Sequence, residues 1–148
     1  MRGLACLVVV ATIVVGPTSL ATSARAEPSV SVRVIVNAKN PVARLERRFV
    51  ADAFLKKRTR WDDDSAIQPV DLGQRSAERA EFSHEVLDRD VSSVRRYWAQ
   101  QVFSGRGVPP PEVSNDADVV RYVAEHPGGI GYVAAGTGLT GVKTVEIE

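Results

Sequence analysis

The chain has 148 residues, of which 44% are hydrophobic and 25% are charged, and its formal net charge is +1. A charge so close to zero excludes the strong positive field by which many proteins bind nucleic acid or anionic membranes. The length is enough for one domain with a hydrophobic core of its own.

The first 26 residues have the pattern of a secretory signal peptide. Met1-Arg2 supplies positive charge, residues 4–15 are almost all apolar, and Ala24-Arg25-Ala26 is an A-x-A cleavage site. The apolar run is too short to span a bilayer, which takes about 20 residues. We therefore predict cleavage after Ala26 and a periplasmic or secreted domain over residues 27–148 that does not insert into the membrane.

The predicted mature domain offers little for thiol chemistry or charge-driven binding. Cys6 is the only cysteine and lies within the signal, so the domain would contain no disulfide. Without Arg2 and Arg25 the domain has 17 basic and 18 acidic residues, which gives a net charge of −1. We expect no nucleic-acid partner.

The first half of the mature chain predicts a strand, a helix and a second strand. β-Branched residues dominate 30–36, as in a strand, and apolar residues recur at helical spacing over 42–56. The aspartate-rich segment 61–65 is typical of a turn. The strand expected at 66–72 contains Pro69, which places it at a sheet edge.

Three capped helices follow. Ser76, Asp90 and either Ser114 or Asn115 are residue types that accept the free amides of a helix N-terminus. The first helix carries the apolar residues Phe82, Val86 and Leu87, and the second has one apolar stripe of Val91, Val94, Trp98 and Val102. In the third we expect Val119, Val120 and Val123 to be buried.

Loops and strands complete the chain. Residues 105–111 are rich in glycine and proline and cannot be helical, and Pro127-Gly128-Gly129 ends the last helix. Strands are expected at 130–134 and 142–147. The order β-α-β-α-α-α-β-β predicts an α/β domain with a small mixed sheet of about four strands packed with about four helices.

Most of the polar residues that could form a functional site are explained better by structural roles. The three aspartates 62–64 could bind a hard cation, but they lack ligand spacing and suit a solvated turn better. His84 and His126 have no partner at zinc spacing, and no G-x-S-x-G motif is present. The aromatic residues could form a ligand platform, although core packing is the default. We therefore expect no metal, no cofactor and no enzymatic activity.

The start of the helix after Ser76 is the remaining candidate. Its free backbone amides and the Ser76 hydroxyl could bind an anion, and Arg79 lies one turn on. The alternative is a simple cap that stabilises the helix by about 1 kcal/mol.

An ordered set of motifs resembles the phosphate-binding proteins of bacterial phosphate ABC transporters, in particular their small single-lobe members. The residues that carry the resemblance are Asn40-Pro41, Leu45, Phe54-Leu55, Lys57, Thr59, Trp61, Ile67, Pro69-Val70, Ser76, Arg79, Phe82, Tyr97-Trp98, Phe103-Ser104-Gly105 and Pro127 to Val133. The resemblance implies one lobe of a type II periplasmic-binding-protein-like fold, with Ser76 and Arg79 as anion ligands.

The sequence departs from the family pattern at that site. The family's Gly-Thr pair is replaced by Ala77-Glu78, and the mature chain begins where a second lobe would begin. Glu78 would repel an anion about 4 Å away by roughly 1 kcal/mol even in water.

These observations lead to two hypotheses. The first is an exported solute-binding-type domain, like the substrate-binding protein of a phosphate ABC transporter, with weak or lost binding of phosphate or another small anion. Its partners would be such an anion and a membrane transporter or another envelope protein. The alternative is a periplasmic protein-interaction module on the same scaffold without a small-molecule ligand.

Overall fold

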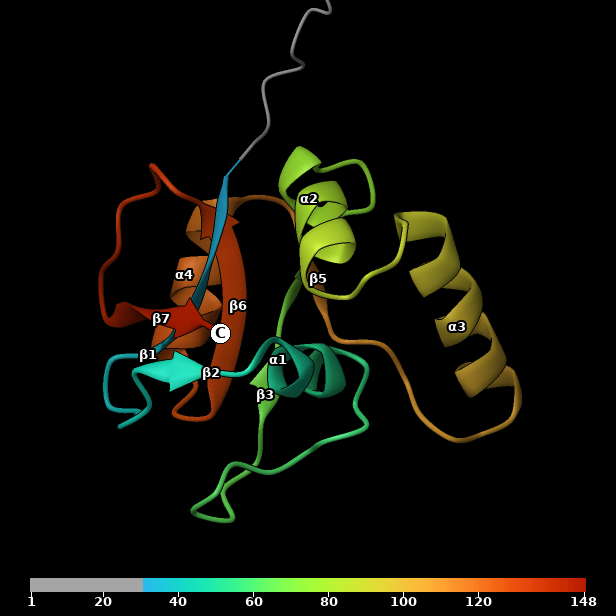
Figure 1. Cartoon of the computed structure of the whole chain (residues 1–148), viewed down its shortest axis with the longest axis horizontal. Coiled ribbons are helices and arrows are strands. Elements are labelled where there is room, and N and C mark those ends of the chain that lie inside the picture. The colour runs from blue at the N-terminus through green and yellow to red at the C-terminus, as the bar shows by residue number, and fades with distance from the viewer. Residues whose placement is uncertain (1–30) are drawn as a thin grey trace, which may run out of the picture.

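The computed structural model describes residues 31–148 (Figure 1). The predicted signal peptide and its cleavage site lie outside the described residues. The helices and strands are β1 (Val32–Asn37), β2 (Arg44–Leu45), α1 (Arg47–Phe54), β3 (Gln68–Pro69), β4 (Asp71–Leu72), α2 (Ala77–Glu85), α3 (Val91–Phe103), β5 (Glu112–Val113), α4 (Asp116–Glu125), β6 (Gly129–Ala134) and β7 (Val142–Ile147).

Five strands form one mixed sheet in the order β2-β7-β1-β6-β3. The central strand β1 runs antiparallel to both neighbours, so that Val34 lies opposite Tyr132 on one side and Val145 on the other. The edge strand β2 runs parallel to β7, and the other edge strand β3 runs parallel to β6. Strands β4 and β5 form a separate parallel pair. The predicted α/β class is confirmed, with four helices in residues 31–148 and a main sheet of five strands instead of about four.

Helices cover both faces of this sheet. A side chain at Gly131 would meet Val119 of α4, whereas the next residue, Tyr132, stacks on Phe82 of α2 with 3.9 Å between ring centroids. Because successive strand residues point to opposite faces, α4 covers one face and α2 the other. Phe54 of α1 joins the second layer, 4.7 Å from the Phe82 ring. Core packing, the expected role of the aromatic residues, is confirmed for Phe82 and Tyr132 but is wrong for Phe103, which is 94% exposed.

Two predicted elements are wrong in extent. The helix expected at 42–56 begins only at Arg47, because Arg44 and Leu45 pair with β7 as strand β2. The strand expected at 66–72 is divided, since β3 pairs with β6 and β4 turns away to pair with β5. Pro69 does lie in an edge strand, as expected.

The predicted caps are confirmed. Side-chain oxygens of Ser76, Asp90 and Asn115 accept backbone amides at the starts of α2, α3 and α4. Hydrogen bonds from Ser92 and Ser93 to the exposed Asp90 carboxylate lower its pKa to about 2, so this cap stays ionised in mild acid.

Helix α3 lies beside α2 (Figure 1), and its Val94 and Trp98 belong to the hydrophobic core. The Tyr97 hydroxyl donates to the Leu55 carbonyl at 2.9 Å. Val102, the last residue of the predicted apolar stripe, is 53% exposed. None of the helices between residues 31 and 148 has the length and hydropathy needed to cross a bilayer.

Asn37 ties the central strand to the end of α4. Its buried amide donates to the carbonyls of Val123 and Ala124, each at 3.0 Å, and of His126 at 3.2 Å. Replacing Asn37 with alanine leaves these acceptors unpaired and is expected to lower the free energy of unfolding by about 1–3 kcal/mol. Asn37→Asp should lose more, because a carboxylate would face three carbonyl oxygens. Urea titration measures both; equal stability of the three proteins would contradict this role.

Candidate functional site

Ser76 ends the turn that leads from β4 into α2. Its backbone is extended, and its Oγ accepts the Arg79 amide at 3.0 Å. The same hydroxyl donates to Glu78 Oε2 at 2.6 Å. The structure therefore places Ser76 as a helix cap whose proton is already directed to a carboxylate of the protein.

An open hollow lies in front of this helix start. Its volume is about 620 Å³, and its lining residues are Gly73, Gln74, Arg75, Ser76, Glu112 and Ser114. Arg75 is exposed and supplies a positive charge, which the Glu112 carboxylate opposes. Arg79 is not among the lining residues, so the two predicted anion ligands do not face the same space.

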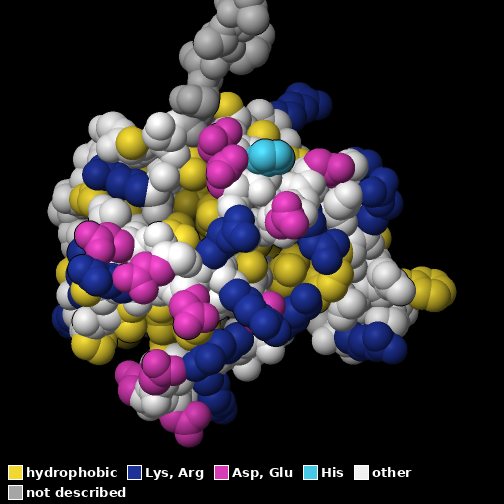
Figure 2. Space-filling view, viewed as in Figure 1, with side chains coloured by type: hydrophobic (Ala, Val, Ile, Leu, Met, Phe, Trp, Pro, Cys, Tyr) yellow, Lys and Arg dark blue, Asp and Glu magenta, His cyan; other side chains and the backbone are white. Residues whose placement is uncertain are grey.

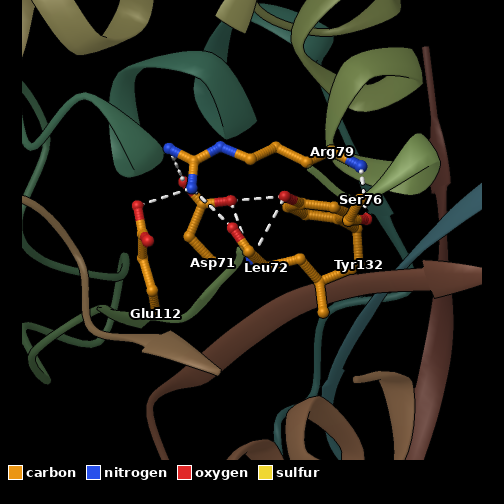
Figure 3. Close-up of polar contacts among 6 residues, drawn as sticks. All are labelled: Asp71, Leu72, Ser76, Arg79, Glu112 and Tyr132. Atoms are coloured by element: carbon orange, nitrogen blue, oxygen red, sulfur yellow. Dashed lines mark hydrogen bonds and ion pairs between the residues drawn. The ribbon is translucent and has the colours of Figure 1, made fainter. Parts of the chain in front are cut away.

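The Arg79 side chain instead lies at the centre of a buried polar cluster, shown in Figure 3. It is only 4% exposed. Its guanidinium contacts Asp71 Oδ2 of β4 at 3.1 Å and Glu112 Oε1 of β5 at 2.6 Å, and it also donates to the Leu72 carbonyl. One residue of α2 thus holds both strands of the small β4-β5 ladder.

Tyr132 completes the cluster from the main sheet. Its hydroxyl donates to Asp71 Oδ1 and accepts the Leu72 amide at 3.3 Å. Burial raises the pKa of the Asp71 carboxyl, and the positive charge of Arg79 opposes that rise. Burial, followed by the nearby Asp71 charge, raises the pKa of Tyr132, so the phenol remains a neutral donor. The cluster has the contacts of a structural network, in which each carboxylate is matched by a donor.

The side-chain donors at the start of α2 are thus already paired with acceptors of the protein itself. The Ser76 hydroxyl bonds to Glu78 and the Arg79 guanidinium bonds to Asp71 and Glu112. An incoming anion would compete with carboxylates for both donors. Free backbone amides of the first turn and the exposed Arg75 are what remains to attract it.

The other polar candidates lie apart from this cluster. The aspartate segment forms the predicted turn, in which Asp62 pairs with Arg58 and Asp63 accepts Ser65 N and Oγ. Residues 31–148 contain no group of three or more His, Cys, Asp or Glu side chains placed to hold a metal ion. His84 is exposed beside Glu85, and His126 stacks on Tyr122.

Sequence reasoning missed three members of the buried cluster. Asp71 and Tyr132 belong to predicted strands, where their pairing across 61 residues leaves no local signal. Glu112 lies in a two-residue strand that follows three prolines and gives no pattern of its own. The family motif did single out Arg79, but as a ligand rather than as a partner of these residues.

Comparison with solved structures identifies the fold. An ABC-type phosphate transport receptor from Vibrio cholerae superposes with a TM-score of 0.62 at 21% sequence identity, over 78% of this chain and 45% of that one. This is the fold of a phosphate-transport substrate-binding protein. A putative phosphate ABC transporter substrate-binding protein from Clostridium perfringens, solved with bound phosphate, also gives a TM-score of 0.62, at 19% identity over 78% of this chain and 44% of that one.

A possible phosphate binding protein from Planctomyces limnophilus has the same fold, with a TM-score of 0.56 and 18% identity over 79% of this chain and 41% of that one. The chain thus spans less than half the length of these phosphate-binding proteins. No protein-family model matches the sequence, and no curated protein matches it significantly.

Proposed function

We propose that this chain is an exported solute-binding-type domain of the phosphate-transport kind in which phosphate binding at the start of α2 is weak or lost. The observation that carries the proposal is the pairing of both candidate ligands with the protein's own carboxylates: Ser76 with Glu78, and Arg79 with Asp71 and Glu112. The domain would act in the cell envelope, without catalysis, beside a membrane transporter or another envelope protein.

The competition can be expressed in energies. Two like charges about 4 Å apart repel by roughly 1 kcal/mol in water and by more where solvent is partly excluded. Glu112 lines the hollow and Glu78 bonds to Ser76, which also lines it, so a doubly charged phosphate would meet this repulsion more than once. Each 1.4 kcal/mol weakens binding tenfold, so two repulsions of about 1 kcal/mol each would weaken phosphate binding about 30-fold.

Thermal unfolding with phosphate tests the proposal. A ligand at about 100 times its dissociation constant adds about 2.7 kcal/mol, which raises the midpoint of so small a domain by several degrees. We expect phosphate at millimolar concentration to leave the wild-type midpoint unchanged. In Glu78→Gln/Glu112→Gln, which removes both competing charges, phosphate should raise the midpoint.

A matched variant separates this effect from a change in overall charge. Glu85→Gln/Glu125→Gln removes two exposed carboxylates that do not line the hollow, and it should behave like the wild type. Tight phosphate binding by the wild type would show that the anion site is retained. An equal response of the two double variants would mean that net charge, and not these contacts, controls binding.

Exposed apolar residues favour the alternative, a protein-interaction module. Phe103 is 94% exposed, Val108 62% and Val102 53%, and all three lie at or beyond the end of α3. Contiguous exposed apolar side chains commonly mark a contact surface, and Val102 and Phe103 line one cavity. Figure 2 shows a hydrophobic side chain projecting from the surface beside the end of α3. If this function holds, a photo-reactive amino acid at position 108 should crosslink to a specific envelope protein. Phe103→Ser should abolish this crosslink without lowering the melting temperature of the domain. Unchanged crosslinking would count against it.

A further inference from the structure

The end of α3 forms an apolar projection (Figure 2), which we call the α3 knob. It consists of Phe103, the last residue of the helix, with Val102 before it and Val108 in the loop beyond, and these residues are 94%, 53% and 62% exposed. Residues 31–148 expose only one other large hydrophobic side chain, Ile147. Because apolar surface is unfavourable in water, the gathering of three such residues at one helix end indicates a contact surface.

A cavity opens beside the knob, which we call the α3 socket. Its volume is about 450 Å³. A cavity of roughly 150 Å³ is enough to hold a benzene ring. The apolar part of the socket wall comes from α3 and the loop after it, and consists of Trp98, Ala99, Val102, Phe103 and Pro109. The socket therefore has room for a phenylalanine ring that approaches from outside.

The charged side chains of the socket wall cancel one another. Arg79 and Arg95 are positive and Glu112 is negative. Asp71, which lies 3.1 Å from Arg79, brings the sum of these four formal charges to zero. The terminal nitrogens of Arg79 are already bonded to these two carboxylates and to the Leu72 carbonyl. A neutral wall of this kind does not select a charged ligand, but it accepts an apolar side chain and does not repel a second copy of itself.

We propose that two copies of this chain form a symmetric dimer, in which the Phe103 ring of each copy enters the α3 socket of the other. A two-fold contact uses the same surface patch on both copies, so that patch has to contain both a projection and a hollow that receives it. The end of α3 has both, because Phe103 projects and Ala99, four residues earlier, lies in the socket wall. The inference goes beyond the proposed phosphate-type function and does not depend on it.

The expected contact is small. Burying an aromatic side chain removes about 150–250 Å² from water. Two phenylalanines, the four valines beside them and the socket walls that they face come to the order of 1,000 Å², which is the lower end for a specific interface. We therefore expect a reversible dimer with a dissociation constant of about 1–100 μM.

Sedimentation velocity of the protein produced from the full-length sequence measures this association. The wild type should pass from monomer to dimer as its concentration rises through the expected range. Phe103→Ser should weaken the dimer by at least about a hundredfold, because a two-fold contact loses the buried ring twice. At a concentration where both proteins are monomeric, the two melting temperatures should agree, since Phe103 is 94% exposed within one copy.

A second variant changes the socket and leaves the knob in place. Ala99→Trp fills the socket and should also abolish the dimer. Ala117→Trp is the matched control, because it makes the same substitution at an exposed position of α4, on the other face of the main sheet, and it should dimerise like the wild type.

Mixing the two monomeric variants tests the way the copies fit together. Phe103→Ser keeps an intact socket and Ala99→Trp keeps an intact ring, so the mixture should form a dimer with one of the two contacts. This mixed dimer should be weaker than the wild type and stronger than the dimer of either variant alone.

Three results would overturn the inference: a wild type that stays monomeric at the highest concentration, equal association of Phe103→Ser and the wild type, or no mixed dimer from the two variants. The photo-reactive amino acid at position 108 separates the possible partners. It should crosslink two copies of this chain. A monomeric wild type that crosslinks to another envelope protein would contradict the dimer and assign the knob to the protein-interaction alternative.

Discussion

Replacing Arg79 with methionine is expected to lower the free energy of unfolding by about 3–5 kcal/mol. The substitution leaves the Asp71 carboxylate buried without its charged partner, and it also removes the donor to the Leu72 carbonyl and to Glu112. Losing one member of a buried ion pair is far more destabilising than losing a pair at the surface, where the contribution is about 0–1 kcal/mol. Urea unfolding followed by circular dichroism measures the difference.

Arg48→Met is the matched control, because the Arg48 side chain is 89% exposed and reaches Asp52 only at 3.8 Å. It should change stability by less than about 1 kcal/mol. The double variant Asp71→Asn/Arg79→Met should lose less than the sum of its single variants, since no buried charge then lacks a partner. Additive losses would mean that the two side chains do not depend on each other.

Gly128→Ala is expected to destabilise the domain by about 3 kcal/mol or more, since overpacking at backbone is at the upper end of its range. A β-carbon at Gly128 would lie 1.9 Å from the Ala66 carbonyl oxygen, so a backbone segment would have to move. The Gly128 carbonyl accepts Gln68 N at 2.9 Å and the Trp61 indole at 3.2 Å. Moving it would therefore disturb the β3 edge and the buried tryptophan together.

Gly136→Ala serves as the control for this prediction, because a β-carbon there meets no heavy atom within 4 Å. It should change stability by less than about 0.5 kcal/mol. The tryptophan emission spectrum, to which Trp61 and Trp98 contribute, should shift for Gly128→Ala and stay constant for Gly136→Ala. If Gly128→Ala is as stable as the wild type, the backbone of residues 66–68 can move aside without lowering the free energy of unfolding.

Local signals predicted the helices well. The caps at Ser76 and Asp90 act on residues within three positions, and sequence spacing is enough to find them. The predicted start of the first helix was wrong because a distant strand pairs there: Arg44 and Leu45 pair with β7, about 100 residues later. A helical pattern cannot reveal that competition, because the partner strand is remote in the chain.

The candidate site was predicted only in part, for a related reason. Ser76 was expected to be either a cap or an anion ligand, and the cap is what the structure shows it making. Arg79 on an otherwise polar helix gives no sign of burial, because the carboxylates that allow it lie on β4 and β5. Long-range electrostatic pairing decides such positions, and a single sequence does not encode it in any local pattern.

The central place of β1 has a consequence for how the chain folds. Within residues 31–148 this strand has β6 and β7 as its only neighbours, so its pairing closes loops of more than 90 residues. Contacts that distant favour slow folding. At about 5–20 residues per second, a ribosome needs roughly 5–20 s to make the intervening segment. During synthesis the central strand β1 therefore stays unpaired until β6 and β7 have been made, and it remains accessible to other proteins for that time.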